Sequence, residues 1–215
     1  MRPLIKLDSM KATMKTLSAI LICCFISTIQ MYGENIQRPE SENYVKGVEA
    51  LNEGNPEAAY TYLNAEINEH PDNGYAHCYM ALICNICNDT KLALKALNSS
   101  LELIPEADTE YRSFAHYSRG VLLTNLKMWE HAEADLNEAI RLNPEDVENY
   151  KSRAQLYFET ERYEESLDDL TRALKLDSKA DVNDLVLQLM AVAPTSEFME
   201  RITATYQQLD QVTIH

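Results

Sequence analysis

Cys84 and Cys87 form a CxxC pair, which is the clearest chemical motif in this sequence. A CxxC pair can bind zinc or cycle between a dithiol and a disulfide. His77 lies seven residues before Cys84 and shares its helix face, so His77, Cys84 and Cys87 are the candidate metal ligands. A zinc site usually draws on a second pair of ligands, and the sequence contains no second CxxC.

The expected position of this pair argues against redox chemistry. A redox-active thiol is favoured at the start of a helix, where the helix dipole lowers its pKa. Cys84 and Cys87 fall near the expected end of a helix, where the dipole raises the pKa of a thiol. The sequence therefore favours packing residues, as free cysteines commonly are, and a thiol or metal-binding protein is the alternative.

Other candidate catalytic groups have structural explanations. The five glycines fall at a segment boundary, inside helices or at turns, and neither a glycine-rich phosphate loop nor a GxSxG motif occurs. His77 and His116 occupy equivalent positions and are interpreted as packing side chains. The sequence thus predicts no enzyme, no cofactor and no metal. Two acidic clusters are interpreted as solvated helix faces, namely Glu130, Glu133, Asp135 and Glu138, and Glu164, Glu165, Asp168 and Asp169.

The chain is acidic, with a formal net charge of −15 over 215 residues. An acidic surface repels phosphate backbones, and the sequence shows no basic stripe, so nucleic acid is excluded as a partner. Only 5 glycines and 7 prolines occur, which is typical of an all-helical protein. We expect a protein or peptide partner and no small-molecule substrate.

The first 33 residues differ in composition from the rest. Several basic residues precede the apolar run of residues 17–29, which is the layout of a secretory signal peptide. The run is shorter than the roughly 20 residues of a membrane-spanning helix. We expect a signal peptide over 1–33, a short linker over 34–39, and a periplasmic or secreted protein. The alternative is an uncleaved anchor that holds the protein at the membrane through residues 17–29.

Similar segments recur along the remainder with a period of 34 residues. The segments end at Pro71, Pro105, Pro144 and Ser178, at spacings of 34, 39 and 34 residues. An insertion of five residues, Asp108–Arg112, accounts for the longer spacing. We expect it to lengthen the next helix by about one turn, at roughly 1.5 Å per residue.

Small residues and leucines recur at fixed distances before each of these ends. Small residues allow two helices to cross closely, and Asn55, Asp89 and Asp146 stand where helices are expected to begin. Each segment therefore predicts two antiparallel helices joined by a short turn. The recurring residues are Gly47, Ala81, Gly120 and Ala154; Ala59, Ala93, Ala132 and Ser166; and Leu63, Leu97, Leu136 and Leu170.

This combination resembles the tetratricopeptide repeat family over four repeats, at 40–73, 74–107, 108–146 (with the insertion at its start) and 147–180. The resemblance implies an all-α, right-handed superhelix (an α-solenoid) of helix-turn-helix pairs. Residues 181–215 are expected to supply a C-terminal capping helix pair, its last helix capped by Ser196. Some positions depart from the family pattern: Arg119 and Arg153 replace a leucine, and Glu66 replaces a small residue.

In this family the first helix of each repeat lines the concave side, which implies a binding groove. Its exposed stripe here combines apolar and aromatic residues with asparagines, whose amides can bind a peptide backbone. Lys151 stands nearly alone as a basic residue, so binding of acidic C-termini is disfavoured, and a peptide or partner helix is expected. The candidate groove residues are Tyr44, Val48, Asn52, Tyr75, Leu82, Asn85, Phe114, Tyr117, Val121, Asn125, Lys151, Gln155 and Phe158.

Alternatives to this groove remain open. Tyr44, Tyr75 and Tyr117 could simply pack against neighbouring first helices. The main prediction is a non-catalytic scaffold or adaptor. Its rivals are an N-terminal repeat portion or accessory subunit of a larger exported enzyme or transport system, the thiol or metal protein, and a self-associating scaffold.

Overall fold

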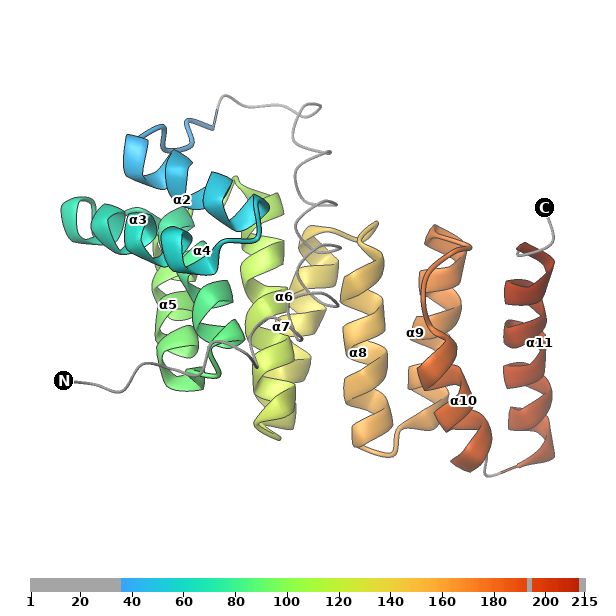
Figure 1. Ribbon diagram of the computed structural model, residues 1–215. Helices are drawn as coiled ribbons and strands as arrows, with labels where there is room; N and C mark the ends of the chain where they lie inside the picture. Colours follow the sequence, from blue (N-terminus) through green and yellow to red (C-terminus); the bar gives the residue numbers. More distant parts are fainter. Residues whose placement is uncertain (1–35, 193–194, 213–215) are drawn as a thin grey trace. The chain divides into compact units, whose positions relative to one another are not determined.

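The computed structural model describes residues 36–192 and 195–212 (Figure 1). These residues form α-helices and no strand, which confirms the predicted all-α class. The expected signal peptide and its apolar run 17–29 lie outside the described residues. Within the described part, no helix combines the length and the apolar character needed to cross a membrane. The chain divides after Ala115 into two compact units.

The first compact unit contains two helical hairpins and the start of a further helix. α2 packs against α3, α4 packs against α5, and α3 also contacts α4. Gly47 permits the first of these crossings, because a Cβ atom at this position would lie 2.6 Å from Cγ of Leu63. The helices are α2 (Glu42–Asn52), α3 (Pro56–Glu69), α4 (Gly74–Ile86), α5 (Thr90–Leu103) and α6 (Thr109–Asn125), whose later part belongs to the second compact unit.

The second compact unit repeats this arrangement and ends in two further helices, drawn in orange and red in Figure 1. α8 packs against both α7 and α9, and α10 and α11 both contact α9. Phe198 and Ile202 of α11 are fully buried in the core that α9 and α10 share. The helices are α7 (Trp129–Leu142), α8 (Val147–Glu159), α9 (Tyr163–Leu176), α10 (Asn183–Val192) and α11 (Ser196–Val212).

Short polar side chains begin several helices, as the sequence predicts. Asn55, Asp89 and Asp146 each precede a helix and accept a backbone N–H from its first turn, at 3.0–3.1 Å. Asn73 caps α4 in the same way and was not anticipated. The predicted cap at Ser196 is wrong: Oγ1 of the preceding residue, Thr195, accepts the N–H of Phe198 at 3.1 Å. Ser196 is already helical, so its hydroxyl is one position too late to act as the cap.

The turn inside each hairpin uses the left-handed backbone conformation. Four residues at the 34-residue spacing, again interrupted once by the insertion, have positive φ angles. Only the first is a glycine, for which this conformation carries no Cβ penalty. The residues and their φ angles are Gly54 (72°), Asn88 (58°), Lys127 (59°) and Glu161 (60°).

The insertion at Asp108–Arg112 has the predicted effect on helix length. α6 has 17 residues, whereas α4 and α8, the corresponding helices of the neighbouring hairpins, have 13 each. Asp108 directly precedes α6, and its Oδ1 accepts the backbone N–H of Tyr111 at 3.3 Å. Arg112 donates from one nitrogen to the carbonyl oxygens of Leu101 and Ile104, at the end of α5. The inserted residues therefore join the end of one helix to the start of the next.

Two members of the acidic clusters are buried rather than solvated. Asp135 is 5% exposed and Asp169 is 6% exposed. Arg119 pairs with Asp135 and Arg153 pairs with Asp169, each through two hydrogen bonds of 2.7–2.8 Å. The interpretation of these two aspartates as outer-face residues was therefore wrong, because the arginines of the preceding helix neutralise them. Each arginine that departs from the family pattern therefore forms an ion pair with an aspartate of its own hairpin.

Glu66 also departs from the family pattern and is also buried, at 1% exposure. Its Oε1 accepts a hydrogen bond of 2.7 Å from the side-chain amide of Asn73. The carbonyl oxygen of the same amide accepts the backbone N–H of Ala76 at the start of α4. Glu66 therefore helps to hold the cap that begins the second hairpin.

Candidate functional site

The residues expected to line the groove differ widely in exposure. Tyr44 and Tyr75 are buried, at 7% and 5%. The three asparagines, Asn52, Asn85 and Asn125, are exposed. The structure therefore leaves the three amides accessible to solvent and buries two of the predicted aromatic rings. The remaining candidates are partly buried: Val48, Leu82, Phe114, Tyr117, Val121, Lys151, Gln155 and Phe158.

The two buried tyrosines belong to an aromatic cluster in the first compact unit. The rings of Tyr44 and Tyr79 have centroids 6.0 Å apart, and Tyr75 meets Tyr111 edge-on at 4.9 Å. The hydroxyls of Tyr79 and Tyr111 are 3.0 Å apart and share a hydrogen bond. Burial raises the pKa of each of these four phenols, so the cluster stays neutral. For Tyr44 and Tyr75, the packing alternative left open by the sequence describes what the structure shows.

A buried carboxylate lies at the polar end of this cluster. Asp108 is 1% exposed, and its Oδ2 accepts a hydrogen bond of 3.0 Å from the hydroxyl of Tyr75. The guanidinium of Arg38 binds both oxygens of Asp108, at 3.1 and 3.2 Å, and also Glu110 at 2.9 Å. Arg38 comes from the segment before α2, 70 residues away in sequence. Neither Arg38 nor Asp108 was a sequence candidate, although the insertion that carries Asp108 was visible in the repeat spacing.

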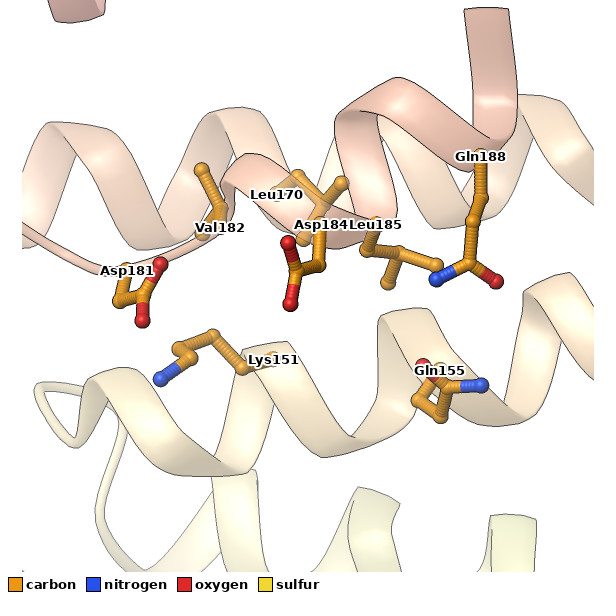
Figure 2. A pocket seen from close by; sticks show the side chains of 8 residues that line it. All are labelled: Lys151, Gln155, Leu170, Asp181, Val182, Asp184, Leu185 and Gln188. Carbon is orange, nitrogen blue, oxygen red and sulfur yellow. The ribbon is translucent and has the colours of Figure 1, made fainter. Parts of the chain in front are cut away.

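The second compact unit contains an opening between α8 and α10, shown in Figure 2, with a volume of about 180 Å³. Two predicted groove residues of α8, Lys151 and Gln155, lie on one side of it and face the opposite wall. Leu170, Val182 and Leu185 supply a buried apolar part of the lining. Exposed polar side chains from the segment leading into α10 and from α10 complete the opposite wall: Asp181, Asp184 and Gln188.

The polar side chains that line this opening differ in the hydrogen bonds they make within the protein. Nζ of Lys151 donates to Glu148 at 2.8 Å, and the amide nitrogen of Gln155 donates to Glu159 at 2.9 Å. Asp181 and Asp184 are exposed and can accept hydrogen bonds from outside. An apolar floor with an acidic and amide rim suits a long side chain that ends in a hydrogen-bond donor. The predicted groove residues did not include Asp181, Asp184 and Gln188, because these lie in the region expected to form the capping helices.

The candidate metal ligands do not form a cluster. Among the described contacts, His77 makes no hydrogen bond with a cysteine. Its Nε2 lies 2.9 Å from the carbonyl oxygen of Pro71. Among the described residues, no group of three or more His, Cys, Asp and Glu side chains is arranged to hold a metal. Cys84 is buried in α4, while Cys87 is its partly buried C-cap residue, which confirms their predicted place at a helix end. Burial, followed by the charge of Asp89, raises the pKa of the Cys84 thiol to about 11.

His116 has a more specific environment than expected. Its Nδ1 lies 2.9 Å from Oδ1 of Asp135, the carboxylate that also binds Arg119. From the sequence, His116 is interpreted as a packing side chain, and the structure adds this polar contact to Asp135. Burial acts to raise the pKa of Asp135, but the hydrogen bonds from Arg119 and His116 outweigh it and hold the pKa below its usual value. This trio joins the two helices of one hairpin and is structural in character.

Helical hairpins that follow one another at a fixed period define the class of α-solenoid proteins. A family model described as "Tetratricopeptide repeat" matches residues 115–146 and 148–179. Residues 115–179 therefore contain two tetratricopeptide repeats, as the resemblance implied.

Two curated relatives support this family. "Tetratricopeptide repeat protein 6" of Homo sapiens is 24% identical over 143 residues, which are 66% of this chain and 26% of that protein. "Lipoprotein NlpI homolog" of Haemophilus influenzae is 31% identical over 87 residues, which are 40% of this chain and 28% of that protein. The matched regions therefore span about a quarter of the length of each relative.

Solved structures support the fold. A MamA chain from Desulfovibrio magneticus RS-1 superposes with a TM-score of 0.64 at 19% identity, covering 79% of this chain and 94% of that chain. A thermophilic tetratricopeptide repeat protein of Thermus thermophilus, TTC0263, gives a TM-score of 0.58 at 18% identity, covering 78% and 88%. At these identities the likeness concerns the α-solenoid fold alone.

Proposed function

We propose that this chain is a non-catalytic protein-interaction scaffold that binds a peptide or partner helix along the first helices of its repeats. The family supports a protein-interaction role in general. The observation that carries the specific proposal is the opening in the second compact unit, where Lys151 and Gln155 of the expected stripe face Asp181 and Asp184. A bound segment would insert a side chain there and hydrogen-bond its backbone to exposed asparagines such as Asn125.

We assign the repeats of this scaffold as the sequence predicts them, at 40–73, 74–107, 108–146 and 147–180, with capping helices in 181–215. The paired helices α2 to α9 support this division. In the proposal the capping helices have a second role. α10 closes the repeat core with Leu185 and Leu189, and its polar face supplies one wall of the opening.

The test compares three versions of the protein in crosslinked pull-downs from native extract, followed by calorimetry with the purified partner. Lys151→Ala/Gln155→Ala removes one wall of the opening. Lys175→Ala/Gln207→Ala is the matched control, because both residues are exposed in the same compact unit and lie outside the opening. We expect a partner that binds wild type and the control and binds the Lys151/Gln155 variant at least about tenfold more weakly, a loss of about 1.4 kcal/mol. Equal binding by all three proteins, with unchanged helicity, would contradict the proposed surface.

We also propose that the protein acts outside the cytoplasm, exported through the segment 1–33. The basic and apolar layout of that segment supports this, and the similarity to a relative named as a lipoprotein is consistent with it. Cell fractionation of the full-length chain, with Leu21→Arg as the variant that interrupts the apolar run, tests the proposal. Export of both versions in equal amount would contradict it.

A second candidate is a part or accessory subunit of a larger exported assembly. It is favoured by one observation: the matched regions make up about a quarter of each curated relative. Size-exclusion chromatography of native extract distinguishes the two candidates. The scaffold alone elutes near the mass of a single chain after high-salt treatment, whereas a stable subunit stays in a larger complex.

A further inference from the structure

We propose that Asp108, Glu110 and Tyr111 form a binding site for an arginine side chain of an extended partner segment. In this structure the protein's own Arg38 occupies the site and acts as a built-in competitor. The inference deepens the proposed function by assigning one partner chemistry. It concerns the first compact unit, whereas the scaffold proposal is tested in the second.

The site surrounds a guanidinium on three sides. Asp108 accepts hydrogen bonds from Nε and one terminal nitrogen of Arg38, at 3.1 and 3.2 Å. Glu110 accepts a hydrogen bond from the same terminal nitrogen at 2.9 Å. The guanidinium carbon lies 4.5 Å from the centroid of the Tyr111 ring. Two carboxylates and an aromatic face are the partners that the flat, forked guanidinium prefers. Lysine, a point charge without the fork, cannot make the paired contact with Asp108.

The buried carboxylate makes a cation necessary. Asp108 is 1% exposed, so its charge lies outside bulk water. Its oxygens also accept from the Tyr75 hydroxyl and the Tyr111 backbone N–H, but both of these donors are neutral. Within the described part of the chain, Arg38 is the basic residue that pairs with it. Leaving such a carboxylate without a counter-charge is strongly unfavourable, so an empty site would favour any accessible guanidinium.

The segment that brings Arg38 is suited to exchange. Residues 36–40 lead into α2 at the blue end of the ribbon in Figure 1, and Gln37 and Glu40 are exposed. Among the described residues, the backbone hydrogen bonds outside helices begin at Ser41 and include none from this segment. The side chain of Arg38 is itself 25% exposed, so the site opens to solvent where the guanidinium enters. Ile36 and Pro39 are partly buried, but among the described contacts the side-chain hydrogen bonds of this segment all come from Arg38. A second guanidinium can compete for the same acceptors.

The site arises from the departure in the repeat period. Asp108, Glu110 and Tyr111 all belong to the five-residue insertion, and Tyr75 stands near the start of the preceding hairpin. An insertion that only lengthened α6 would need no buried charge. The inserted sequence instead places one carboxylate before the helix and another in its first turn, where the helix dipole favours negative groups.

The test uses the full chain and a labelled, end-blocked peptide that copies residues 36–40 (IQRPE). Fluorescence anisotropy measures its binding to wild type, to Arg38→Ala and to Arg38→Lys. A tethered competitor acts at an effective concentration on the order of millimolar, so we expect Arg38→Ala to bind the peptide at least about tenfold more tightly than wild type. Arg38→Lys is expected to fall between them, because its amine competes less well.

Two controls assign the binding to this site. Arg38→Ala/Asp108→Asn, which keeps the shape but removes the charge, is expected to lose the peptide. A peptide with citrulline in place of arginine, of nearly the same shape but neutral, is expected not to bind, and a lysine peptide is expected to bind several-fold more weakly than the arginine peptide.

The contradicting results are equally specific. The proposal is overturned if folded Arg38→Ala fails to bind the peptide, if binding survives Asp108→Asn, or if the citrulline peptide binds equally well. If Arg38→Ala does not fold alone, Arg38→Lys carries the test. Its thermal midpoint should then rise with added arginine peptide and not with citrulline peptide, and an equal response to both would overturn the proposal. Each of these results leaves the Lys151/Gln155 experiment unaffected, so failure of one proposal is distinguishable from failure of the other.

Discussion

The guanidinium of Arg153 faces the carboxylate of Asp169 in a paired contact, with both N···O distances at 2.7 Å. Arg119 and Asp135 make the same contact 34 residues earlier, at 2.7 and 2.8 Å. In each case the arginine lies on the first helix of a hairpin and the aspartate on the second. Each of two successive hairpins thus contains an equivalent Arg–Asp ion pair. In both, the arginine stands where the family pattern has a leucine.

The first prediction concerns the strength of this pair. Asp169→Asn leaves Arg153, whose side chain is 20% exposed, without its charge partner, and we expect a loss of about 1–3 kcal/mol in the free energy of unfolding. The neighbouring Asp168→Asn is the matched control, since Asp168 is exposed and its pair with Arg201 is expected to contribute less than about 1 kcal/mol. Urea denaturation of both variants checks this. Equal midpoints for the two variants would contradict it.

The second prediction concerns acid stability. Because Arg119 and His116 hold the pKa of Asp135 below its usual value, its ionised form is favoured in the folded protein. Its contribution is complete above the pKa of an unfolded aspartate, about 3.9, and is lost as the pH falls from there through the lower folded pKa. Asp135→Asn should therefore lie closer in stability to wild type at pH 3 than at pH 6. Urea midpoints measured across this range provide the test, and a constant difference would contradict it.

The third prediction concerns the left-handed turns. Glu161 has a φ of 60°, so Glu161→Gly relieves a conformation that costs a side-chain-bearing residue about 1 kcal/mol. The greater freedom of glycine in the unfolded chain offsets part of this gain. We expect Glu161→Gly to be neutral or stabilising by a few tenths of a kcal/mol, and Gly54→Ala to be destabilising by about 1 kcal/mol. Thermal denaturation that ranks the two variants in the opposite order would show that these turns are not limited by backbone conformation.

The fourth prediction concerns thiol reactivity, measured after Cys23 and Cys24 are replaced by serine. Burial raises the pKa of Cys78 to about 12 and that of Cys84, with the charge of Asp89, to about 11. Very little of the Cys84 thiol is therefore ionised at pH 8, whereas partly buried Cys87 is more accessible to reagent. We expect Cys87 to react first with a thiol reagent and the other two to react mainly after unfolding. Faster labelling on addition of a chelator would instead indicate a bound metal.

The fifth prediction concerns the start of α11. Thr195 accepts the N–H of Phe198, whereas Ser196 is the first residue of the helix. Thr195→Ala should lower the free energy of unfolding by about 1 kcal/mol, and Ser196→Ala should have little effect. Chemical denaturation compares the two. A larger loss for Ser196→Ala would restore the cap that the sequence alone suggested.

Much of the fold could be predicted from the sequence because its signals are local or periodic. The 34-residue period, the small residues opposite leucines, and the caps at Asn55, Asp89 and Asp146 all express preferences within a few residues or one repeat. The longer α6 followed from the spacing of the prolines. The cap at Thr195 was missed because adjacent threonine and serine are both good caps, and only the backbone decides between them.

The candidate sites depended on tertiary structure. Tyr44 and Tyr75 carry the residue type of a binding surface, yet their rings pack with Tyr79 and Tyr111 from other helices. The composition of a helix stripe does not say whether a neighbouring helix covers it. In the second compact unit, Lys151 and Gln155 of the predicted stripe line one side of the opening, but residues of the opposite wall come from α10 and the segment before it.

By itself the sequence determined an all-α chain of repeated hairpins, an insertion before the third, and an acidic protein without a recognisable catalytic motif. Only the tertiary structure decided which charges meet. Arg38 and Asp108 are 70 residues apart and belong to no shared pattern, and Asp135 and Asp169 look solvated when their own helix is considered alone. Helix formation depends on neighbours within a turn or two, whereas ion pairing and burial depend on which distant segments exclude water together.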